Sequence, residues 1–400
     1  MKDPDVAIVG GGVVGAALAC ALADKGLTLT LIDAQTPAPY DPKGEVDLRV
    51  FALSMASRRI LEALGVWPAV AAARLSPYRD MQVWDAGGKG SVHFDSADLG
   101  EPELGYIAEN SLLQHALWAR LKGNSKVTLM HPAKAEALAL EDTGATLTLD
   151  GGRRLKARLV VAADGAGSAT RALAGIEVQS EAYGQRAVVA HVRTELPHQA
   201  TAWQRFLRTG PVAFLPLADG RCSIVWSADE AEAARILALD DAGFGAALTT
   251  ASESRLGQVQ STTRRLSFPL QRLHAREYVR PRFALAGDAA HALHPLAGQG
   301  VNLGLLDAAA LAQVIGDAVH KGRDVGDLGV LRRYERWRKG ENLAMIFALD
   351  AFKRLFSNEN AAISMVRNAG LRAVDGFTPV KHAFVRRAMG LSGDLPLLAR

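Results

Sequence analysis

The chain has 400 residues, which is enough for two or three domains or for one large interleaved unit. Its content of 49% hydrophobic and 22% charged residues is ordinary for a globular protein. The net charge is +4, and the sequence has no run of lysines and arginines. We therefore expect no nucleic-acid partner. Cys20 and Cys222 lie far apart and indicate reduced thiols in a cytoplasmic protein. We also expect no signal peptide and no membrane-spanning segment.

A strand over residues 5–9, a glycine-rich loop and a helix over residues 16–25 form the first predicted unit. The loop carries the pattern G-x-G-x-x-G at Gly10, Gly12 and Gly15. The first glycine permits a tight turn, the second lets a pyrophosphate approach, and the third allows close packing of helix on strand. The pattern and its context predict dinucleotide binding, without separating NAD from FAD.

An acidic residue closes the next predicted strand, which covers residues 27–32. This residue, Asp33, follows Gly15 by 18 positions and is placed to bond the ribose of an adenosine. The spacing strengthens the prediction of a dinucleotide site at the start of the chain.

A second acid-glycine turn follows an apolar strand over residues 159–163. Asp164 and Gly165 begin the pattern D-G-x-x-S-x-x-R, which continues with Ser168 and Arg171. One interpretation is a cofactor-binding turn. The other is an ordinary strand-to-helix turn in which Asp164 caps the helix.

Short alternating strands with aromatic residues are predicted between residues 187 and 227, with a hairpin turn at Asp219 and Gly220. They indicate a mostly antiparallel sheet, covered by helix over residues 229–251. Trp203, Phe214 and Trp226 are candidates either for the lining of a pocket or for plain core.

A third stretch consists of a strand over residues 283–286, an acid-containing turn, a glycine-containing loop and a helix. A carboxylate at a strand end can hold a hydroxylated ligand, and glycines let the backbone approach a flat ring. The helix start adds free N–H groups and a partial positive charge, which suits the negative edge of a reduced flavin. The alternative is a plain turn. The residues that carry the pattern are Gly287, Asp288, Pro295, Gly298, Gly300 and Asn302.

Taken together, these stretches resemble the three fingerprints of the flavin-dependent aromatic hydroxylases, in the form used by the ubiquinone-biosynthesis hydroxylases. The narrower likeness rests on residues 291–307, 354–360 and 389–391, and it is nearest to the branch that adds the first ring hydroxyl. Asp33 stands where this family more often has glutamate.

The resemblance implies an α/β fold with a Rossmann-like FAD-binding domain, an interleaved and mostly antiparallel substrate domain, and a C-terminal helical region. The FAD-binding domain would comprise residues 1–75, 98–178 and 270–330. The substrate domain would comprise residues 76–97 and 179–269, and the helical region residues 331–400.

The resemblance also implies the site. Arg49 matches an arginine that lies along the cofactor, and either Asn110 or Gln114 would reach the FAD from the helix that they begin. Pro295, Gly298 and Gly300 would form the loop that faces the flavin. The implied FAD contacts are Gly10, Gly12, Gly15, Asp33, Arg49, Asp164, Gly165, Gly287, Asp288, Pro295, Gly298, Gly300 and Asn302.

No catalytic base can be assigned, although His291, His294 and Arg193 are possibilities, and no metal is implied. The implied activity uses NAD(P)H to reduce FAD and dioxygen to form a flavin C4a-hydroperoxide, which hydroxylates the ring of a polyprenylated phenol. The absence of a second G-x-G-x-x-G fits transient NAD(P)H binding. Three alternatives stay open: a hydroxylase of a small soluble aromatic, a flavin-dependent prenyl reductase, and a non-enzymatic flavoprotein scaffold.

The last 60 residues carry eight lysines and arginines and five acids, a net charge of +3 that is mixed with phenylalanines. This composition fits a solvated face on packing helices. It also fits peripheral contact with the inner membrane or with other ubiquinone-biosynthesis proteins through residues 352–387.

Overall fold

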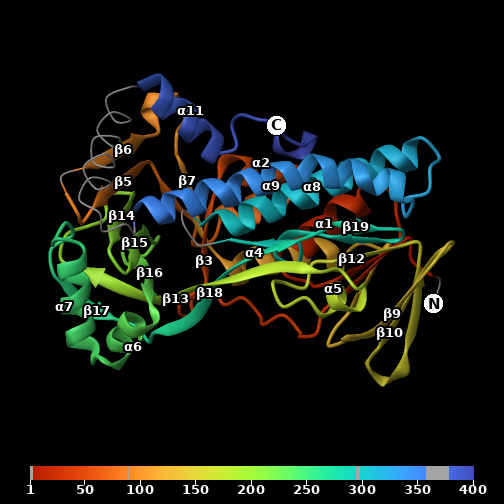
Figure 1. Cartoon of the computed structure of the whole chain (residues 1–400), viewed down its shortest axis with the longest axis horizontal. Coiled ribbons are helices and arrows are strands. Elements are labelled where there is room, and N and C mark those ends of the chain that lie inside the picture. Colours follow the sequence, from red (N-terminus) through yellow and green to blue (C-terminus); the bar gives the residue numbers. More distant parts are fainter. Residues whose placement is uncertain (1–2, 89, 294–297, 357–377) are drawn as a thin grey trace.

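The protein is described by a computed structural model over residues 3–88, 90–293, 298–356 and 378–400. Two large sheets lie at opposite ends of the molecule, and the long helices α8 (Gln299–His320) and α9 (Leu328–Phe356) run along one side of it (Figure 1). The chain passes from one sheet to the other several times, so each sheet is built from segments distant in sequence.

The first large sheet is six-stranded, and its central strands are parallel. Its inner strands read as continuous apolar runs such as VAIV and LVVA because they are buried in one core with helix α1 (Val13–Ala23) and with residues of the small strands β10 (Gly144–Leu149) and β11 (Arg154–Ala157). On one face, α1 packs between α8 and α4 (Asn110–Lys122). In spatial order the strands are β19 (Val279–Arg280), β20 (Phe283–Leu285), β12 (Leu159–Ala162), β1 (Val6–Val9), β2 (Leu29–Ile32) and β8 (Val127–Met130).

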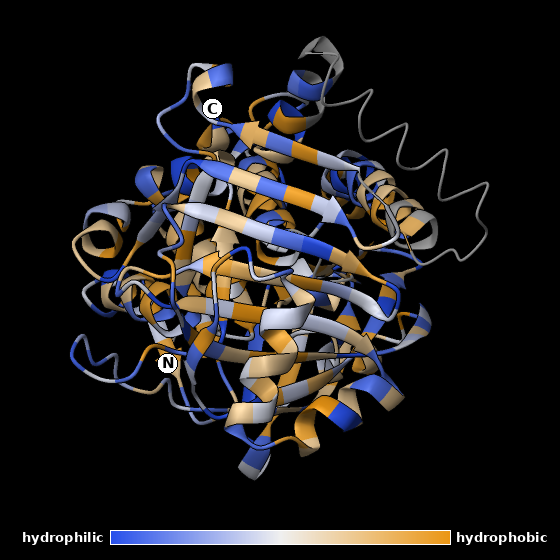
Figure 2. Ribbon diagram, turned by 90° about the vertical axis from the view of Figure 1, so that its left-hand side faces the viewer, coloured by the Kyte–Doolittle hydropathy of each residue, from blue (hydrophilic) through white to orange (hydrophobic). Residues whose placement is uncertain are grey.

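The second large sheet is nine-stranded, and all of its pairs are antiparallel except β14 with β5. Hydrophobic and hydrophilic residues alternate along its strands (Figure 2). In order these are β21 (His291–Ala292), β18 (Leu266–Ala275), β13 (Val178–Thr194), β16 (Cys222–Asp229), β15 (Gly210–Pro216), β14 (Thr201–Leu207), β5 (Asp80–Asp85) and β6 (Ser91–Asp95), with β17 (Val259–Thr262) beside β13.

The two faces of the nine-stranded sheet have different neighbours. One face packs with α6 (Glu230–Ala238) and α7 (Asp241–Ala251) to form a separate apolar core. The other face is turned toward the six-stranded sheet and lines a large cavity. Alternate residues of β5, β15 and β16 therefore face the cavity, whereas consecutive residues of β18 line it.

Smaller elements complete the fold. Two three-stranded sheets comprise β9 (Ala135–Glu141), β10 (Gly144–Leu149) and β11 (Arg154–Ala157), and β3 (Val50–Leu53), β7 (Gly105–Glu109) and β4 (Ser76–Tyr78). The remaining helices are α2 (Met55–Ala63), α3 (Trp67–Ala71), α5 (Ala169–Leu173) and α11 (Thr378–Ala388), and short 3-10 turns include η3 (Gly287–Ala289).

The predicted fold class is confirmed, and the helices predicted near Asn110 and over residues 328–356 are present. Strand β13 is longer than the predicted strand, since it begins at Val178 and pairs along most of β18. The strands of the six-stranded sheet fall inside the ranges predicted for the FAD-binding domain, whereas β18 crosses the boundary set at residue 270. The domain boundaries themselves stay a proposal.

By length and composition alone, α8 could cross a membrane. It is instead a core helix, because most of its residues are buried against α1, α2 and α9. The segment predicted to contact a membrane lies mostly outside the described residues, which resume at Thr378.

Candidate cofactor and substrate site

A cavity of about 1910 Å³ lies between the two large sheets. The glycine loop after β1 and the turns after β2, β12 and β20 form one wall, where the six-stranded sheet presents its strand ends. The nine-stranded sheet, one side of α9, strand β3, the start of α8 and residues between 385 and 395 contribute the rest. Crevices at the carboxyl ends of parallel strands are the usual ligand sites of such sheets.

The three glycines of the first loop have different environments. Gly10 has φ +108°, and a Cβ there would lie 2.3 Å from the carbonyl oxygen of Ala163. A Cβ at Gly15 would lie 1.9 Å from the carbonyl oxygen of Gly10, so both positions require glycine. At Gly12, which lines the cavity and caps α1, a Cβ would meet nothing within 4 Å. This open position at a helix N-terminus fits a pyrophosphate.

Asp33 lines the cavity after β2, and its carboxylate accepts a 2.6 Å hydrogen bond from the Gly11 N–H. On the other side of this loop, the Gln114 and Trp118 side chains donate to the Gly11 carbonyl oxygen at 2.9 and 2.7 Å. Gln114 therefore supports the loop, whereas Asn110 lines the cavity. Of the two candidates on α4, Asn110 is the one placed to reach a bound cofactor.

The second acid-glycine turn is both a helix cap and part of the cavity wall. Asp164 accepts hydrogen bonds from the Ser168 hydroxyl and, at 3.1 Å, from the Thr170 N–H, while Asp164 and Gly165 also line the cavity. The buried Arg171 guanidinium donates to the Ala289 carbonyl oxygen at 2.9 Å. This hydrogen bond connects the second fingerprint, which ends at Arg171, to the third, which lies 118 residues further along the chain.

The third fingerprint holds a carboxylate at the cavity surface. Gly287 has φ +62° and packs against Val14, where a side chain would be crowded, while Asp288 faces the cavity. Burial raises the pKa of Asp288, although the charges of His291 and Arg49 act in the opposite direction. Arg49 itself is exposed, lines the cavity and lies over the Phe51 ring at 5.4 Å.

The start of α8 is positioned by Asn302, whose amide is fully engaged with protein. Its Nδ2 donates to the carbonyl oxygens of Ala52 and Gly298 at 2.8 and 3.0 Å. Its Oδ1 accepts from the Ser54 N–H at 2.9 Å and from the Ser57 hydroxyl at 2.6 Å. Any contribution of Asn302 to cofactor binding would therefore come through its backbone.

The two glycines of the predicted flavin-facing loop differ. Gly298 has φ +62°, and a Cβ there would lie 3.0 Å from the Ala52 Cβ rather than in open space. Gly300 lines the cavity, and the nearest atom to a Cβ there would be an Asp288 oxygen at 3.9 Å. Pro295 and His294 lie outside the described residues.

A buried charged network lies behind Gly287 and Asp288. Asp307 on α8 accepts from the Gly287 N–H at 3.2 Å and from the Arg338 Nε of α9 at 2.8 Å, and its Oδ2 lies 2.5 Å from His291 Nε2. Burial alone would raise the pKa of Asp307, but the charges and hydrogen bonds of His291 and Arg338 outweigh it and lower the pKa to about 2. The Asn342 Nδ2 also donates to Asp307 at 3.1 Å and to the Tyr278 hydroxyl at 3.4 Å, which extends the network to Tyr278.

The burial and location of the candidate catalytic side chains show which of them could reach a ligand in the cavity. His291 is completely buried in the network and is not part of the cavity wall, and Arg193 is exposed on β13 away from it. Neither is placed to act as a base on a ligand in the cavity. In the part of the chain that the structure describes, no cluster of His, Cys, Asp or Glu could hold a metal ion.

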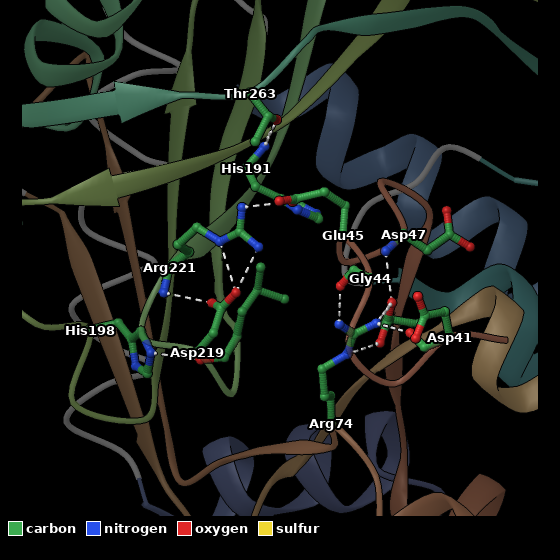
Figure 3. A network of polar contacts seen from close by, with 12 residues as sticks. Asp41, Gly44, Glu45, Asp47, Arg74, His191, His198, Asp219, Arg221 and Thr263 are labelled. Carbon is green, nitrogen blue, oxygen red and sulfur yellow. Dashed lines mark hydrogen bonds and ion pairs between the residues drawn. The ribbon is translucent and has the colours of Figure 1, made fainter.

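The loop between β2 and β3, which contains Glu45, is linked to the nine-stranded sheet by an ion pair with Arg221 (Figure 3). Arg221, after the turn between β15 and β16, pairs with Asp219 at 2.7 Å and with Glu45 at 3.3 Å. Arg74 holds the same loop through Glu109 and the Gly44 carbonyl oxygen. The loop leads directly to Arg49 and β3, so these contacts help to set that wall of the cavity.

The sheet side of the cavity is mainly apolar. Phe206 of β14 lines it and stacks on Phe356 of α9 with ring centroids 4.0 Å apart. Of the predicted aromatic candidates, Phe214 and Trp226 belong to the core on the other face, and Trp203 packs against the same core beside Phe214 and also reaches the cavity wall. The lining of α9, which includes Arg338, Met345 and Leu349, was not predicted, because helical periodicity does not show which partner a face covers.

Most of the predicted cofactor residues meet at this cavity, although their roles toward FAD stay predictions. Gly15 and Gly287 lie behind the wall and allow close packing. The predicted residues that line the cavity are Gly10, Gly12, Asp33, Arg49, Asp164, Gly165, Asp288, Gly298, Gly300 and Asn302.

Comparison with known proteins agrees with this geometry. A family model described as an FAD binding domain matches residues 3–342. The chain is 41% identical over 390 residues to the 3-demethoxyubiquinol 3-hydroxylase of Escherichia coli K12, covering 98% of this chain and 99% of the relative. It is 40% identical over 402 residues to the ubiquinone hydroxylase UbiL of Rhodospirillum rubrum, covering 100% of this chain and 93% of the relative.

The human ubiquinone biosynthesis monooxygenase COQ6 is 35% identical over 427 residues, with 94% of this chain and 90% of the relative covered. Among solved structures, the p-nitrophenol 4-monooxygenase PnpA of Pseudomonas putida is similar with a TM-score of 0.79 at 20% identity, covering 98% of this chain and 100% of that one. PqsL of Pseudomonas aeruginosa has a TM-score of 0.78 at 24% identity, with 93% and 100% covered. At these identities the structures show a shared fold.

Proposed function

Since the chain belongs to the FAD-binding-domain family of flavin-dependent monooxygenases, we propose that it hydroxylates the aromatic ring of a polyprenylated phenol in ubiquinone biosynthesis, with NAD(P)H and dioxygen as co-substrates. The observation that carries this proposal is the large cavity between the two sheets. Its polar wall fits a dinucleotide and its apolar wall fits a prenylated ring.

The chain's own residues would bind and orient the cofactor. Gly12 leaves room for the pyrophosphate at the N-terminus of α1, and Asp33 would accept hydrogen bonds from the adenosine ribose. Asp288 would accept from the ribityl chain, and the start of α8 would supply N–H groups to the flavin edge. When bound, FAD supplies hydride acceptance from NAD(P)H and activation of dioxygen.

The apolar wall would hold the substrate and exclude water. Met81, Phe206 and Leu349 line the part of the cavity between the sheet and α9. Exclusion of water favours transfer of oxygen to the ring over loss of peroxide. The apolar lining of this part of the cavity, together with the ubiquinone-biosynthesis names of the relatives, is the reason to prefer a prenylated phenol over a small soluble aromatic.

Two hydroxylation steps are candidates. The likeness of residues 354–360 and 389–391 favours the first ring hydroxylation. The 41% identity to a protein named 3-demethoxyubiquinol 3-hydroxylase favours a later one. Paired assays with a short-chain 2-prenylphenol and a short-chain 3-demethoxyubiquinol decide between them, because one of the two should give a hydroxylated product.

Oxygen consumption separates the proposed function from its rivals. A monooxygenase consumes about one dioxygen per NAD(P)H and per hydroxylated ring. A prenyl reductase would oxidise NAD(P)H without stoichiometric oxygen uptake, and a scaffold would not turn over. Hydroxylation of tail-less phenols alone would favour the small-aromatic hydroxylase.

The substrate tail also implies contact with a membrane or with a carrier, since each buried CH₂ of a prenyl chain is worth about 0.8 kcal/mol. Of the cations on α11, Arg386 is exposed, whereas Arg387 pairs with Glu341 and Lys381 lies 3.6 Å from Asp98. We propose weak peripheral docking through this region. Flotation with anionic liposomes at low and high salt tests it, with Arg386→Ser expected to reduce flotation.

A further inference from the structure

A transverse row of side chains crosses seven strands of the nine-stranded sheet on the face turned toward the cavity. Every member of the row lines the cavity, and all but one are apolar. The exception is Gln204 on β14, which carries an amide. In spatial order the row is Val92, Val83, Gln204, Ala213, Val225, Val189 and Leu266.

The neighbours of Gln204 along its own strand are also apolar. Ala202 and Phe206 lie two residues to either side, on the same face, and both line the cavity. Phe206 stacks on Phe356 and belongs with Val83 to an apolar cluster that also contacts Leu349 of α9. The amide therefore stands in the apolar part of the cavity, between the sheet and α9.

This amide has no protein partner. Gln204 is 8% exposed, and no hydrogen bond joins its side chain to any other residue in the described part of the chain. Two other half-buried glutamines have partners: Gln114 donates to the Gly11 carbonyl oxygen, and Gln313 accepts from the Leu397 N–H at 2.9 Å. The amide atoms of Gln204 are not among the fully buried atoms without a partner, so the amide opens onto the cavity, where a ligand can supply the hydrogen bonds that the protein does not.

We infer that Gln204 binds an oxygen of the aromatic substrate and so determines which ring position is hydroxylated. This inference rests on the proposed function. An amide both donates and accepts hydrogen bonds, as does a phenol hydroxyl, whereas the other members of the row and the neighbours of Gln204 on β14 offer only apolar contact. One fixed polar contact in an apolar pocket sets the orientation of the ring.

A matched pair of variants tests the inference. Gln204→Met removes the amide while keeping the length of the side chain. Gln82→Met makes the same change on the neighbouring strand β5, at a half-buried position that faces away from the row and does not line the cavity. The probes are 2-geranylphenol and geranylbenzene, which differ only in the hydroxyl, titrated into the FAD-loaded protein and followed by flavin absorbance.

Wild type and Gln82→Met should bind the phenol at least about tenfold more tightly than the hydrocarbon, a difference of about 1.4 kcal/mol. In Gln204→Met the two affinities should agree within about twofold, through weaker binding of the phenol. Its FAD content and melting temperature should match or exceed those of wild type, since no protein hydrogen bond is lost.

Three results would overturn the assignment of Gln204. They are an unchanged preference for the phenol in Gln204→Met, an equal loss of preference in Gln82→Met, and a fall in the melting temperature of Gln204→Met that shows a structural role. Failure of wild type to bind either probe would instead overturn the proposed function, and the inference with it.

Discussion

His291 Nε2 and Asp307 Oδ2 lie 2.5 Å apart, and both side chains are completely buried. Arg338 from α9 bonds the second oxygen of the same carboxylate, which also accepts from the Gly287 N–H. Polar side chains from three elements, β21, α8 and α9, thus meet directly behind the Gly287–Asp288 turn. This network joins α9 to the Gly287–Asp288 wall of the cavity.

Asp307→Ala should destabilise the protein by about 3–5 kcal/mol, because it leaves the buried Arg338 guanidinium without its carboxylate and removes the hydrogen-bond partner of His291. Asp317→Ala on the same helix provides the control. Its carboxylate pairs with Arg333 at 3.1 Å with both side chains about two-fifths exposed, so the expected cost is about 0–1 kcal/mol. Urea unfolding measures both; equal costs would show that the buried network does not support the fold.

Gly12→Val should lose FAD without losing the fold. Its side chain would project into the cavity where a pyrophosphate is expected, and it would meet no protein atom within 4 Å of its Cβ. FAD should bind at least about tenfold more weakly, whereas the apoprotein should stay folded and lose only about 1 kcal/mol, because valine replaces glycine at the N-cap of α1. Gly15→Ala should instead reduce stability by about 1–3 kcal/mol through overpacking against Gly10. Full FAD occupancy in Gly12→Val would disprove this placement.

Gly300→Ala should uncouple NAD(P)H oxidation from hydroxylation. The methyl group would enter the cavity near Asp288, and the helical position tolerates alanine. We expect more hydrogen peroxide per NAD(P)H at unchanged melting temperature. Gly298→Ala would be a poorer test, because it would place its methyl group against Ala52 at φ +62° and strain the backbone by about 1–3 kcal/mol. Unchanged coupling in Gly300→Ala would count against a flavin ring at this position.

His191→Leu should remove part of the acid sensitivity of the fold. His191 is buried beside Arg221 (Figure 3), and neither of its ring nitrogens has a hydrogen-bond partner in the described structure. Burial, with a smaller contribution from Arg221, lowers its pKa to about 4 from an ordinary 6.5. The stabilisation is therefore complete above about pH 6.5 and is lost as the pH falls toward 4.

When the pH falls from 7 to 5, His191 should lower the unfolding free energy of wild type by about 2 kcal/mol. The leucine variant should not show this part of the loss. The replacement breaks no hydrogen bond, so stability at pH 7 should be unchanged or higher. Urea titrations at the two pH values measure the difference, and parallel losses in the two proteins would refute the account.

The glycine and acid fingerprints were predictable because each is local. Gly10, Gly12 and Gly15 serve one turn, and Asp33 follows at the end of the adjacent strand. The long helix over residues 328–356 was predictable from its periodicity, and the structure has it at Leu328–Phe356.

The remainder depends on contacts between distant segments. Asp307, His291 and Arg338 come from separate elements, and no spacing in the sequence shows that they meet. Asn302 was predicted to contact the cofactor, but its amide is used to join α8 to Ala52 and α2. For Gln204, alternation along β14 separates two faces, and only the tertiary fold shows which of them lines the cavity.

The most direct test of the central claim is isotope incorporation during turnover. FAD-loaded protein is supplied with NAD(P)H, ¹⁸O₂ and either short-chain 2-prenylphenol or short-chain 3-demethoxyubiquinol. The masses of the products are then measured by mass spectrometry. The account predicts one ¹⁸O atom in the ring of a hydroxylated product, at about one NAD(P)H per product. NAD(P)H oxidation in which neither substrate acquires ¹⁸O would contradict it.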